Sequence, residues 1–497
     1  MPPMDMEIRT YLLYILAAVS LPSLASLLYG QRHSLKSTIP PFVGTTNIIS
    51  SCLTAFKLQF SGTKMLHKAY AQHGNGVFRL PSFFRWTYLI SEPKLVSEMA
   101  SAPEHIVSFN GGLEDVLQTD WTIGQDVTEN PYHTPAIRVG LRNINQYFPQ
   151  LHDELVHAFD DTLALQNHEW KLITVVPTIM QIISRSTSRV FLGLPLCRNQ
   201  EYLDLTNNHN MRIFFRLTDS PYLPKLPETD YRSADHDSQE CQIERDVGHE
   251  WPDRPNDLIS WLLDFAEEEE RTAEALVRRI LTLNLAAHNT WMSLTAALYD
   301  LTRYPEYVLP LREEAEWVVA DQGWTRTSIS NMVKIDSFLR ESQRLSASGP
   351  IGMARQIVAK DGFTFSDGTT VPYGSFLSVP GHNVNTDPVV YENPEVFDGF
   401  RFSRMREGCS GSREGKEGSI FTRHMVTTSP NHVVYGHGRH ACPGRFFAAT
   451  QLKTALAHVL INYDVKAETN GIRPQDHEFS LFKVPNTLGR IYVRKRV

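Results

Sequence analysis

A cysteine in a glycine-rich loop is the residue of this chain best placed to do chemistry. Cys442 stands in the stretch 435–445, Tyr-Gly-His-Gly-Arg-His-Ala-Cys-Pro-Gly-Arg, and an apolar, helix-forming run follows at 446–449. A helix is therefore predicted to begin within a residue or two of the cysteine, with its free amides and the positive end of its dipole facing the sulfur. Such surroundings lower a thiol pKa and favour the thiolate. Gly438 and Gly444 permit sharp turns and the close approach of a flat ligand.

The loop as a whole resembles the haem-binding loop of cytochrome P450 monooxygenases. In that pattern an aromatic residue is followed three positions later by Gly, and then at every second position by a basic residue, Cys and Gly. Tyr435 takes the place of the usual Phe, and His440 that of the usual Arg, in wording similar to the fungal branch of the family. The resemblance implies that Cys442 is the axial ligand of a haem iron, and that Tyr435, His440, Gly438 and Gly444 contact the cofactor. The alternative is a free cysteine in a glycine-rich turn.

Composition agrees with an ordinary globular protein. Of 497 residues, 42 % are hydrophobic and 21 % charged. The net charge of −7 is spread without long blocks of one sign, so nothing indicates binding to nucleic acid. The five cysteines are scattered and form no CxxC or CxxCH motif, which excludes a disulfide framework, a zinc site and a c-type haem attachment. A reduced protein facing the cytosol is predicted.

A long apolar helix is predicted at residues 274–304. Its centre, 281–287, is apolar on nearly every face, as in a helix inside a large core. His288, Asn289 and Thr290 follow, and such side chains need partners, because burying them unpaired is costly. In the family this place carries Ala/Gly-Gly-x-Asp/Glu-Thr. The resemblance implies that Thr290 donates to dioxygen and that His288 or Asn289, with water, replaces the usual acid in proton delivery. The alternative, favoured for His288, is that these residues satisfy one another.

A charged pair lies on a later predicted helix. Glu341 and Arg344 are at i and i+3 and share one helix face. When exposed, such a pair is worth well under ~1 kcal/mol and has no special meaning. In the family the pair is buried and joined by an arginine from a later loop, which here corresponds to Arg401. The resemblance implies a structural triad that serves folding and haem retention rather than chemistry.

Further basic residues match the family's ligands for the haem propionates. Arg138, with His133 as its companion, lies on a predicted helix that resembles the family's third helix, although the usual Trp is absent. Arg355 matches the second propionate ligand. A solvated charge on a helix surface is the alternative for Arg138.

The predicted substrate pocket draws on several segments. Residues 105–127 are predicted to form a loop that lines it, residues 201–227 a mobile lid, and residues 479–494 a final strand pair whose turn touches substrate. A packed surface loop and a helix with core aromatics are the alternatives for the first two. The apolar candidates for contact with a bulky lipophile are Phe109, Trp121, Phe214, Pro350, Ile351, Met353 and Val484.

The N-terminal region contains a candidate membrane anchor. Residues 11–29 carry no charge and are about long enough for one bilayer crossing. Tyrosines stand near both ends, and the basic residues that follow predict a cytosolic body. A cleaved signal peptide is the alternative, which the acidic residues before the run disfavour. The predicted organisation is an anchor and flank at 1–36 and a haem-thiolate monooxygenase domain at 37–497, in the endoplasmic reticulum membrane with a single pass.

The predicted fold is mainly α: the cytochrome P450 fold, a helical haem domain with small β-sheets, plus the N-terminal transmembrane helix. The resemblance implies haem b (iron protoporphyrin IX) as cofactor and O2 as co-substrate. Because the sequence has no GxGxxG motif or fused flavin domain, electrons are expected from NADPH through a separate NADPH-cytochrome P450 reductase. Arg439, Arg445 and Lys453 are predicted to form its basic docking face, with solvated charge as the alternative.

The predicted reaction is hydroxylation, once or in successive steps, of a bulky lipophilic secondary-metabolite intermediate. The fungal wording of the loop implies a terpenoid or meroterpenoid. One alternative is a haem-thiolate isomerase or dehydratase of a peroxide, which Asn289 favours and Thr290 disfavours. Another is a non-catalytic binder of haem or a lipophile.

Overall fold

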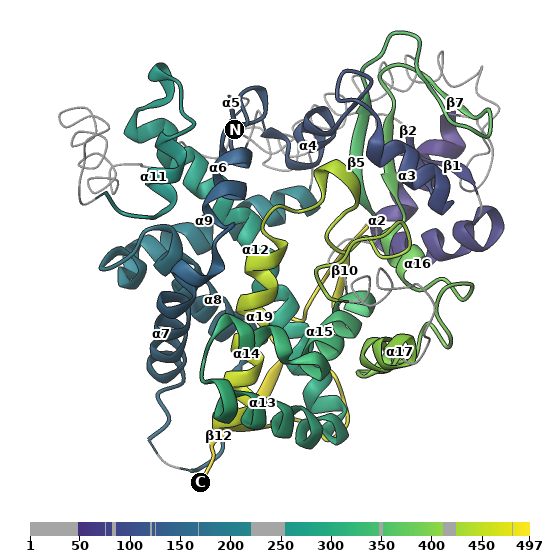
Figure 1. The fold of residues 1–497 in the computed structure, drawn as a ribbon. Helices are drawn as coiled ribbons and strands as arrows, with labels where there is room; N and C mark the ends of the chain where they lie inside the picture. The colour runs from purple at the N-terminus through teal and green to yellow at the C-terminus, as the bar shows by residue number, and fades with distance from the viewer. Residues whose placement is uncertain are drawn as a thin grey trace, which may run out of the picture.

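The described part of the chain is mainly helical, as the sequence predicts, and its sheets are small (Figure 1). A computed structural model describes residues 48–497 except 75, 82–85, 120–121, 125, 167, 220–253, 347–350, 411–423 and 480. The predicted anchor at residues 11–29 lies outside these residues. Within the described ranges, no helix has both the length and the apolar character needed to cross a membrane.

The core is built around α12 (Ala273–Arg303), which confirms the long helix predicted at 274–304. Thr272 caps the first turn, because its side chain accepts a hydrogen bond from the amide of Ala275. The helix ends at Arg303, shortly before Pro305, since the residue before a proline is restricted away from helical conformation.

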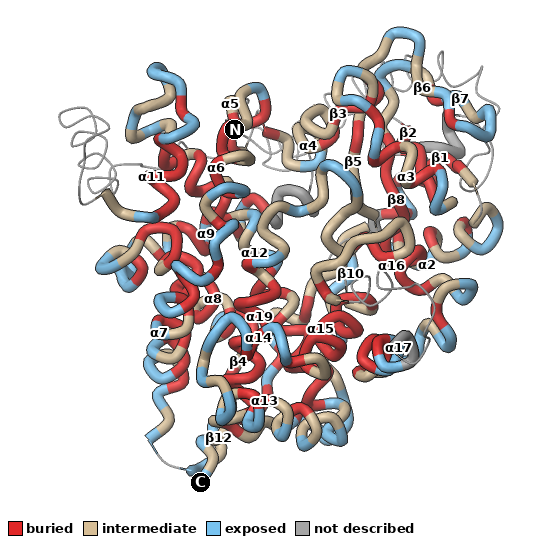
Figure 2. The backbone as a smooth tube through the Cα atoms, in the orientation of Figure 1, coloured by how far each residue is buried: buried red, intermediate tan, exposed pale blue. Residues whose placement is uncertain are grey.

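The helices that pack against α12 include α8 (Val175–Phe191), α15 (Val333–Ser346) and α19 (Arg445–Asn462). Figure 1 shows α12 and α19 side by side near the centre, and Figure 2 shows that they are buried along much of their length. Leu294 of α12 and Leu456 of α19 are fully buried. Burying one leucine side chain is worth about 1.5–3 kcal/mol, so this packing fixes α12 relative to the start of α19.

Other helices surround this core. Those before α12 are α2 (Ile48–His73), α3 (Pro93–Ser101), α4 (Phe109–Leu117), α5 (Asp126–Glu129), α6 (His133–Gly140), α7 (Ile144–Leu163), α9 (Gln200–Asp219) and α11 (Leu258–Leu263). Those after it are α13 (Val308–Gln322), α14 (Arg326–Asn331), α16 (Gly381–Asn385) and α17 (Arg401–Ser410).

The described residues form four sheets beside the helical core. The largest has the order β1-β2-β8-β5-β3 and lies to one side of the helical body (Figure 1). Its strands are β1 (Val77–Pro81), β2 (Trp86–Ile90), β3 (Val107–Ser108), β5 (Gly352–Ile357) and β8 (Phe376–Val379). The smaller sheets are β4 (Lys171–Thr174) with β12 (Arg490–Lys495) and β9 (Tyr463–Ala467), β10 (His477–Phe479) with β11 (Phe482–Val484), and β6 (Phe363–Thr364) with β7 (Thr370–Val371).

Two expectations need correction. Residues 105–127 are not a loop throughout, because α4 begins at Phe109 after Ser108 caps it by accepting from the amide of Gly111. Val484 is not in a turn but in β11, which pairs with β10 across residues 480–481.

Candidate active site

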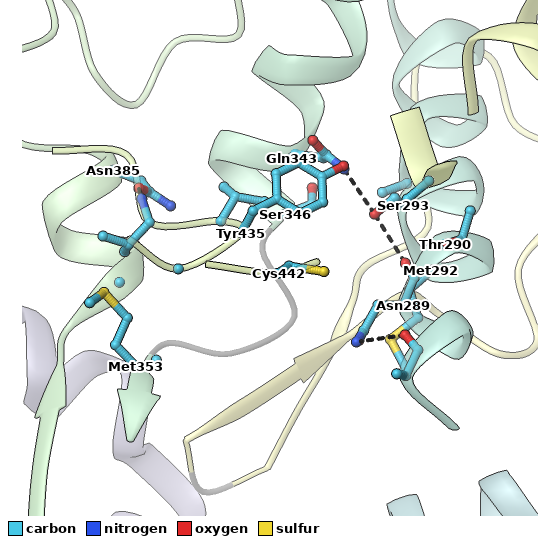
Figure 3. A pocket seen from close by; sticks show the side chains of 18 of the residues that line it. Asn289, Thr290, Met292, Ser293, Gln343, Ser346, Met353, Asn385, Tyr435 and Cys442 are labelled. Carbon is cyan, nitrogen blue, oxygen red and sulfur yellow. Dashed lines mark hydrogen bonds between the residues drawn. The ribbon is translucent and has the colours of Figure 1, made fainter. Parts of the chain in front are cut away.

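A cavity of about 340 Å³ lies between α12 and the cysteine loop (Figure 3). Figure 3 shows the sulfur of Cys442 directed across this space toward α12. Polar side chains line it together with apolar ones, whereas the sequence predicted an overwhelmingly apolar wall. The polar lining residues are Asn289, Thr290, Ser293, Gln343, Ser346, Asn385, Tyr435 and Cys442. The apolar ones include Ala286, Met292, Ala296, Ile351, Met353, Val433, Ala448 and Leu452.

Cys442 lies where the sequence predicted, just before a helix. Gly444 is the N-cap of α19, and the amides of Gly444 and Arg445 donate toward the sulfur. The predicted lowering of the thiol pKa is wrong for the protein alone. Cys442 is exposed where it lines the cavity, but desolvation by the surrounding protein outweighs these amides and raises its pKa. A thiol that coordinates a metal is deprotonated outright. Iron binding, rather than the helix, would therefore supply the thiolate.

The glycines of the cysteine loop are required for different physical reasons. Gly438 has φ +74°, and a Cβ there would lie 2.8 Å from the Cβ of Ala100, so the approach of α3 requires glycine. Gly444 has φ −84°, and no protein atom lies within 4 Å of the position of its Cβ. Gly436, which lines the cavity, has φ +68°. The loop thus leaves open space beside the cysteine, as a flat ligand requires.

The α12 wall carries the residues predicted for the oxygen side. Thr290 is buried and lines the cavity. Asn289 is exposed and also lines it, with its amide nitrogen 3.4 Å from the carbonyl oxygen of Ala286. The side chain of His288 lies outside the described part of the structure. Thr290 and Asn289 therefore come together with Cys442 around one cavity.

Arg355 is a buried cation beside this site. It is 2 % exposed, its guanidinium donates to the carbonyl of Ala354 at 2.8 Å, and burial lowers its pKa to about 10. Among the described residues no carboxylate lies within 4 Å of it. Its guanidinium stacks on Phe109 at 5.0 Å, and the other partner of that ring is His440 at 4.7 Å. A buried guanidinium without an ion pair is costly, so the site fits a ligand that carries carboxylates.

His440 shares this environment. Its Nε2 lies 3.3 Å from a carboxylate oxygen of Glu104. Burial, followed by the charges of Arg355, Arg439 and Arg138, lowers the pKa of His440. Arg138 is exposed, yet it lies within electrostatic reach of His440, as a shared ligand would require.

His133 does not join this group. It is buried, and burial together with the charge of Arg279 lowers its pKa to about 4. His133 and Arg138 are five residues apart on α6, and residues at that spacing point to different faces of a helix. The role of His133 as the companion of Arg138 therefore stays a prediction.

The residues predicted as a triad meet in the core. Both carboxylate oxygens of Glu341 accept from Arg344 at 2.8 Å, and the Nε of Arg401 lies 3.2 Å from each. Glu341 and Arg344 are fully buried. The remaining guanidinium groups donate to backbone carbonyls, those of Asn385 and Pro394 from Arg344 and those of Glu392, Asn393 and Val396 from Arg401. The buried charges are thus fully paired.

Comparison with known proteins agrees with this arrangement. The family model for cytochrome P450 matches residues 56–490. The chain belongs to the cytochrome P450 family. It is 33 % identical to cytochrome P450 monooxygenase 103 of Postia placenta over 98 % of this chain and 98 % of that protein. It is 30 % identical to cytochrome P450 monooxygenase CYP512U6 of Ganoderma lucidum, over 88 % of this chain and 89 % of that protein. It is also 30 % identical to cytochrome P450 monooxygenase olcJ of Penicillium canescens, over 88 % of this chain and 85 % of that protein.

Membership of the cytochrome P450 family confirms the resemblance and makes the protein a monooxygenase, an oxidoreductase that uses haem, O2 and an electron donor. Bound haem supplies the activation of dioxygen, which no amino acid side chain provides. Cys442 would hold the haem iron, and Arg355 and His440 would hold the two propionate carboxylates of the haem. Thr290 would hold a proton at its Oγ on the facing wall, and the apolar lining would exclude water.

Only some of the predicted substrate contacts line the cavity. Ile351 and Met353 line the cavity. Phe109 does not, since it stacks between Arg355 and His440, and Val484 packs against the helical core. Trp121 and Pro350 lie outside the described residues, as does the side chain of Phe214.

The predicted basic docking face also changes. Lys453 is only 5 % exposed, and its ammonium lies 3.6 Å from Asp336. It cannot present its charge to a partner. Arg439 is exposed, and Arg445 stacks on Phe446 at 4.5 Å while donating to the carbonyl of Cys442.

Sequence reasoning missed Gln343, Ser293 and Asn385 as cavity residues. Gln343 lies inside the Glu-Ser-Gln-Arg stretch, one residue before Arg344. Ser293 is three residues after Thr290, a helical spacing that places it on the same side of α12. That spacing could have identified Ser293 as a cavity residue from the sequence.

Proposed function

We propose that this protein is a membrane-anchored monooxygenase that hydroxylates a bulky lipophilic intermediate of secondary metabolism. The observation that carries the proposal is that Cys442 and Thr290 line one cavity. Two residues after the lining residue Met353, Arg355 is buried and has no carboxylate within 4 Å among the described residues. A ligand with two carboxylates and an iron suits this arrangement, and haem b is the form we propose.

The proposed substrate class is a terpenoid or meroterpenoid, oxidised once or in successive steps. Support comes from the apolar side chains of Met292, Ile351, Met353 and Leu452 around the cavity. These apolar side chains suit a bulky lipophile, and polar lining residues such as Ser346 and Asn385 would orient it. The fungal relatives agree with a role in such metabolism by analogy, which is a weak guide to substrate.

The proposed electron donor is NADPH, through a separate NADPH-cytochrome P450 reductase on the same membrane. The proposed organisation is an anchor and flank at 1–36 and a catalytic domain at 37–497 on the cytosolic side of the endoplasmic reticulum. The uncharged run at residues 11–29 and the basic residues that follow it support this orientation. Removing residues 1–36 should release a haem-loaded protein from membranes and weaken its coupling to reductase. Full-length protein in the soluble fraction would contradict the anchor.

The decisive experiment is co-expression with a reductase, followed by feeding of terpenoid, polyketide and indole-alkaloid intermediates. Product with one added oxygen from a terpenoid, formed with consumption of NADPH and O2, supports the proposal. Oxygen added only to another class would overturn the substrate while leaving the monooxygenase. Rearrangement of a hydroperoxide without reductase would favour the isomerase alternative.

A further inference from the structure

One side-chain amide links the two walls of the cavity. The Nε2 of Gln343, on α15, donates to the hydroxyl of Tyr435 at 3.0 Å and lies 3.3 Å from the hydroxyl of Ser293 (Figure 3). Ser293 in turn donates to the carbonyl of Asn289 at 3.1 Å. The chain of hydrogen bonds thus runs from α12, through α15, to the cysteine loop.

Tyr435 passes this contact on to the cysteine. Its backbone carbonyl accepts from the amide of Cys442 at 2.9 Å. The phenolic hydroxyl of tyrosine can both donate and accept hydrogen bonds, so it can accept the bond from Gln343. A phenylalanine here would keep the ring but could not bond to Gln343.

Gln343 makes these bonds at one end of its side chain. It is 5 % exposed, and its Oε1 has no hydrogen-bond partner among the described residues. If the amide were turned by 180°, its Oε1 would take the place of Nε2 and would face the same two hydroxyls, of Tyr435 and Ser293. Losing one hydroxyl would leave a buried amide with one partner fewer, which costs more than the bond itself.

We propose that Gln343 is a positioning residue that couples the cysteine loop to α12 through Tyr435 and Ser293. Its bond to Tyr435 limits movement of the loop, and therefore loss of the Cys442 thiolate from the haem iron. The inference rests on Cys442 as the iron ligand. It assigns a specific task to the hydroxyl that distinguishes Tyr435 from the usual Phe.

The test uses the full-length, haem-loaded protein and the variants Tyr435→Phe and Gln343→Leu. The readouts are the reduction potential of the iron and the rate at which the reduced carbon monoxide complex loses its thiolate-type absorption band. Loss of one such hydrogen bond should speed this conversion by about tenfold, which corresponds to about 1.4 kcal/mol. Both variants should also shift the potential in the same direction, and the double variant should be no worse than Gln343→Leu.

Ser342→Ala is the matched control. Ser342 precedes Gln343 on α15 and also bonds to α12, through Asp300 at 2.6 Å, but in the described part of the chain no hydrogen bond joins its side chain to the cysteine loop. Its loss should lower the melting temperature without changing the rate or the potential.

A rate and potential of Tyr435→Phe equal to those of the wild type would overturn the proposal. So would additive effects in the double variant, or an equal change in Ser342→Ala. Tyr435→Phe keeps the ring, so it decides the matter even if Gln343→Leu fails to bind haem. If Cys442 is not the ligand, the thiolate-type band is missing from the wild type as well, which separates that failure from this one.

Discussion

Two buried carboxylates on α15 meet cations in different ways. Glu341 is enclosed by two guanidinium groups whose other donors all reach nearby carbonyls. Asp336, about one and a half turns earlier, bonds to Arg406 and to the amide of Met425, and Lys453 lies 3.6 Å away. The first cluster fixes the chain beside the cavity, and the second fixes α19, the helix that follows the cysteine.

The charged groups of the Asp336 cluster show how burial and neighbouring charges compete. Burial favours the neutral form of Lys453 and lowers its pKa, while the nearby cations, Lys453 foremost, outweigh burial and lower the pKa of Asp336. Desolvation thus opposes the second cluster, and its cations keep Asp336 in the charged form. We therefore expect the Asp336 cluster to confer dependence on pH. The Glu341 cluster, whose guanidinium groups also bond to backbone carbonyls, should contribute more to stability.

The largest effect is expected for Arg401→Ala. Removing one partner from a buried ion cluster costs about 3–5 kcal/mol, because it leaves Glu341 undercompensated. Haem content and melting temperature should both fall. Arg404→Ala is the control, since Arg404 pairs with Asp398 while its own side chain is 58 % exposed, and an exposed pair is worth less than ~1 kcal/mol. Stable, haem-loaded Arg401→Ala protein would show that the triad is not needed.

A smaller loss is expected for Lys453→Met, because Lys453 lies 3.6 Å from Asp336, whereas Arg401 bonds to Glu341 and also to three backbone carbonyls. The variant should lose about 2 kcal/mol of stability, below the full cost of breaking a buried pair, and bind reductase normally. Arg439→Ala, at an exposed position, should keep its stability but bind reductase more weakly. Weaker reductase binding by Lys453→Met at unchanged stability would return Lys453 to the docking face.

The smallest effect separates the clusters by pH. The folded-state pKa of Asp336 lies below its value in the unfolded chain, so its stabilisation is present above the unfolded pKa and is lost as pH falls through the folded one. Between about pH 5 and pH 3, the melting temperature of the wild type should fall more steeply than that of Asp336→Asn. Parallel curves would remove Asp336 as a source of the pH dependence.

Local pattern predicted the parts of the site that depend on neighbours in sequence. The helix start after Cys442, the long α12 and the shared helix face of Glu341 and Arg344 follow from glycine placement, apolar periodicity and i, i+3 spacing. The haem-binding role of the loop and the burial of the pair were implied by the resemblance to cytochrome P450. The partners of Asp336 do not, because Arg406 is 70 residues away along the chain. A lysine looks the same in sequence whether it is solvated or buried, so Lys453 was misplaced.

Close packing explains the other misses. Gly111 and Gly112 suggested a loop, but they lie in α4 where it crosses β5. A Cβ on Gly112 would lie 2.6 Å from the backbone of Ala354 and Arg355, so glycine is required by contact rather than by a turn. Such contacts join distant segments and leave no local pattern.

The central claim is that Cys442 holds the haem iron, and the carbon monoxide difference spectrum of reduced Cys442→Ser tests it most directly. The account predicts that the wild type gives the thiolate-type band and that Cys442→Ser loses it entirely. Cys197→Ser, at a buried cysteine that does not line the cavity, should keep it. A thiolate-type band that survives in Cys442→Ser would contradict the assignment.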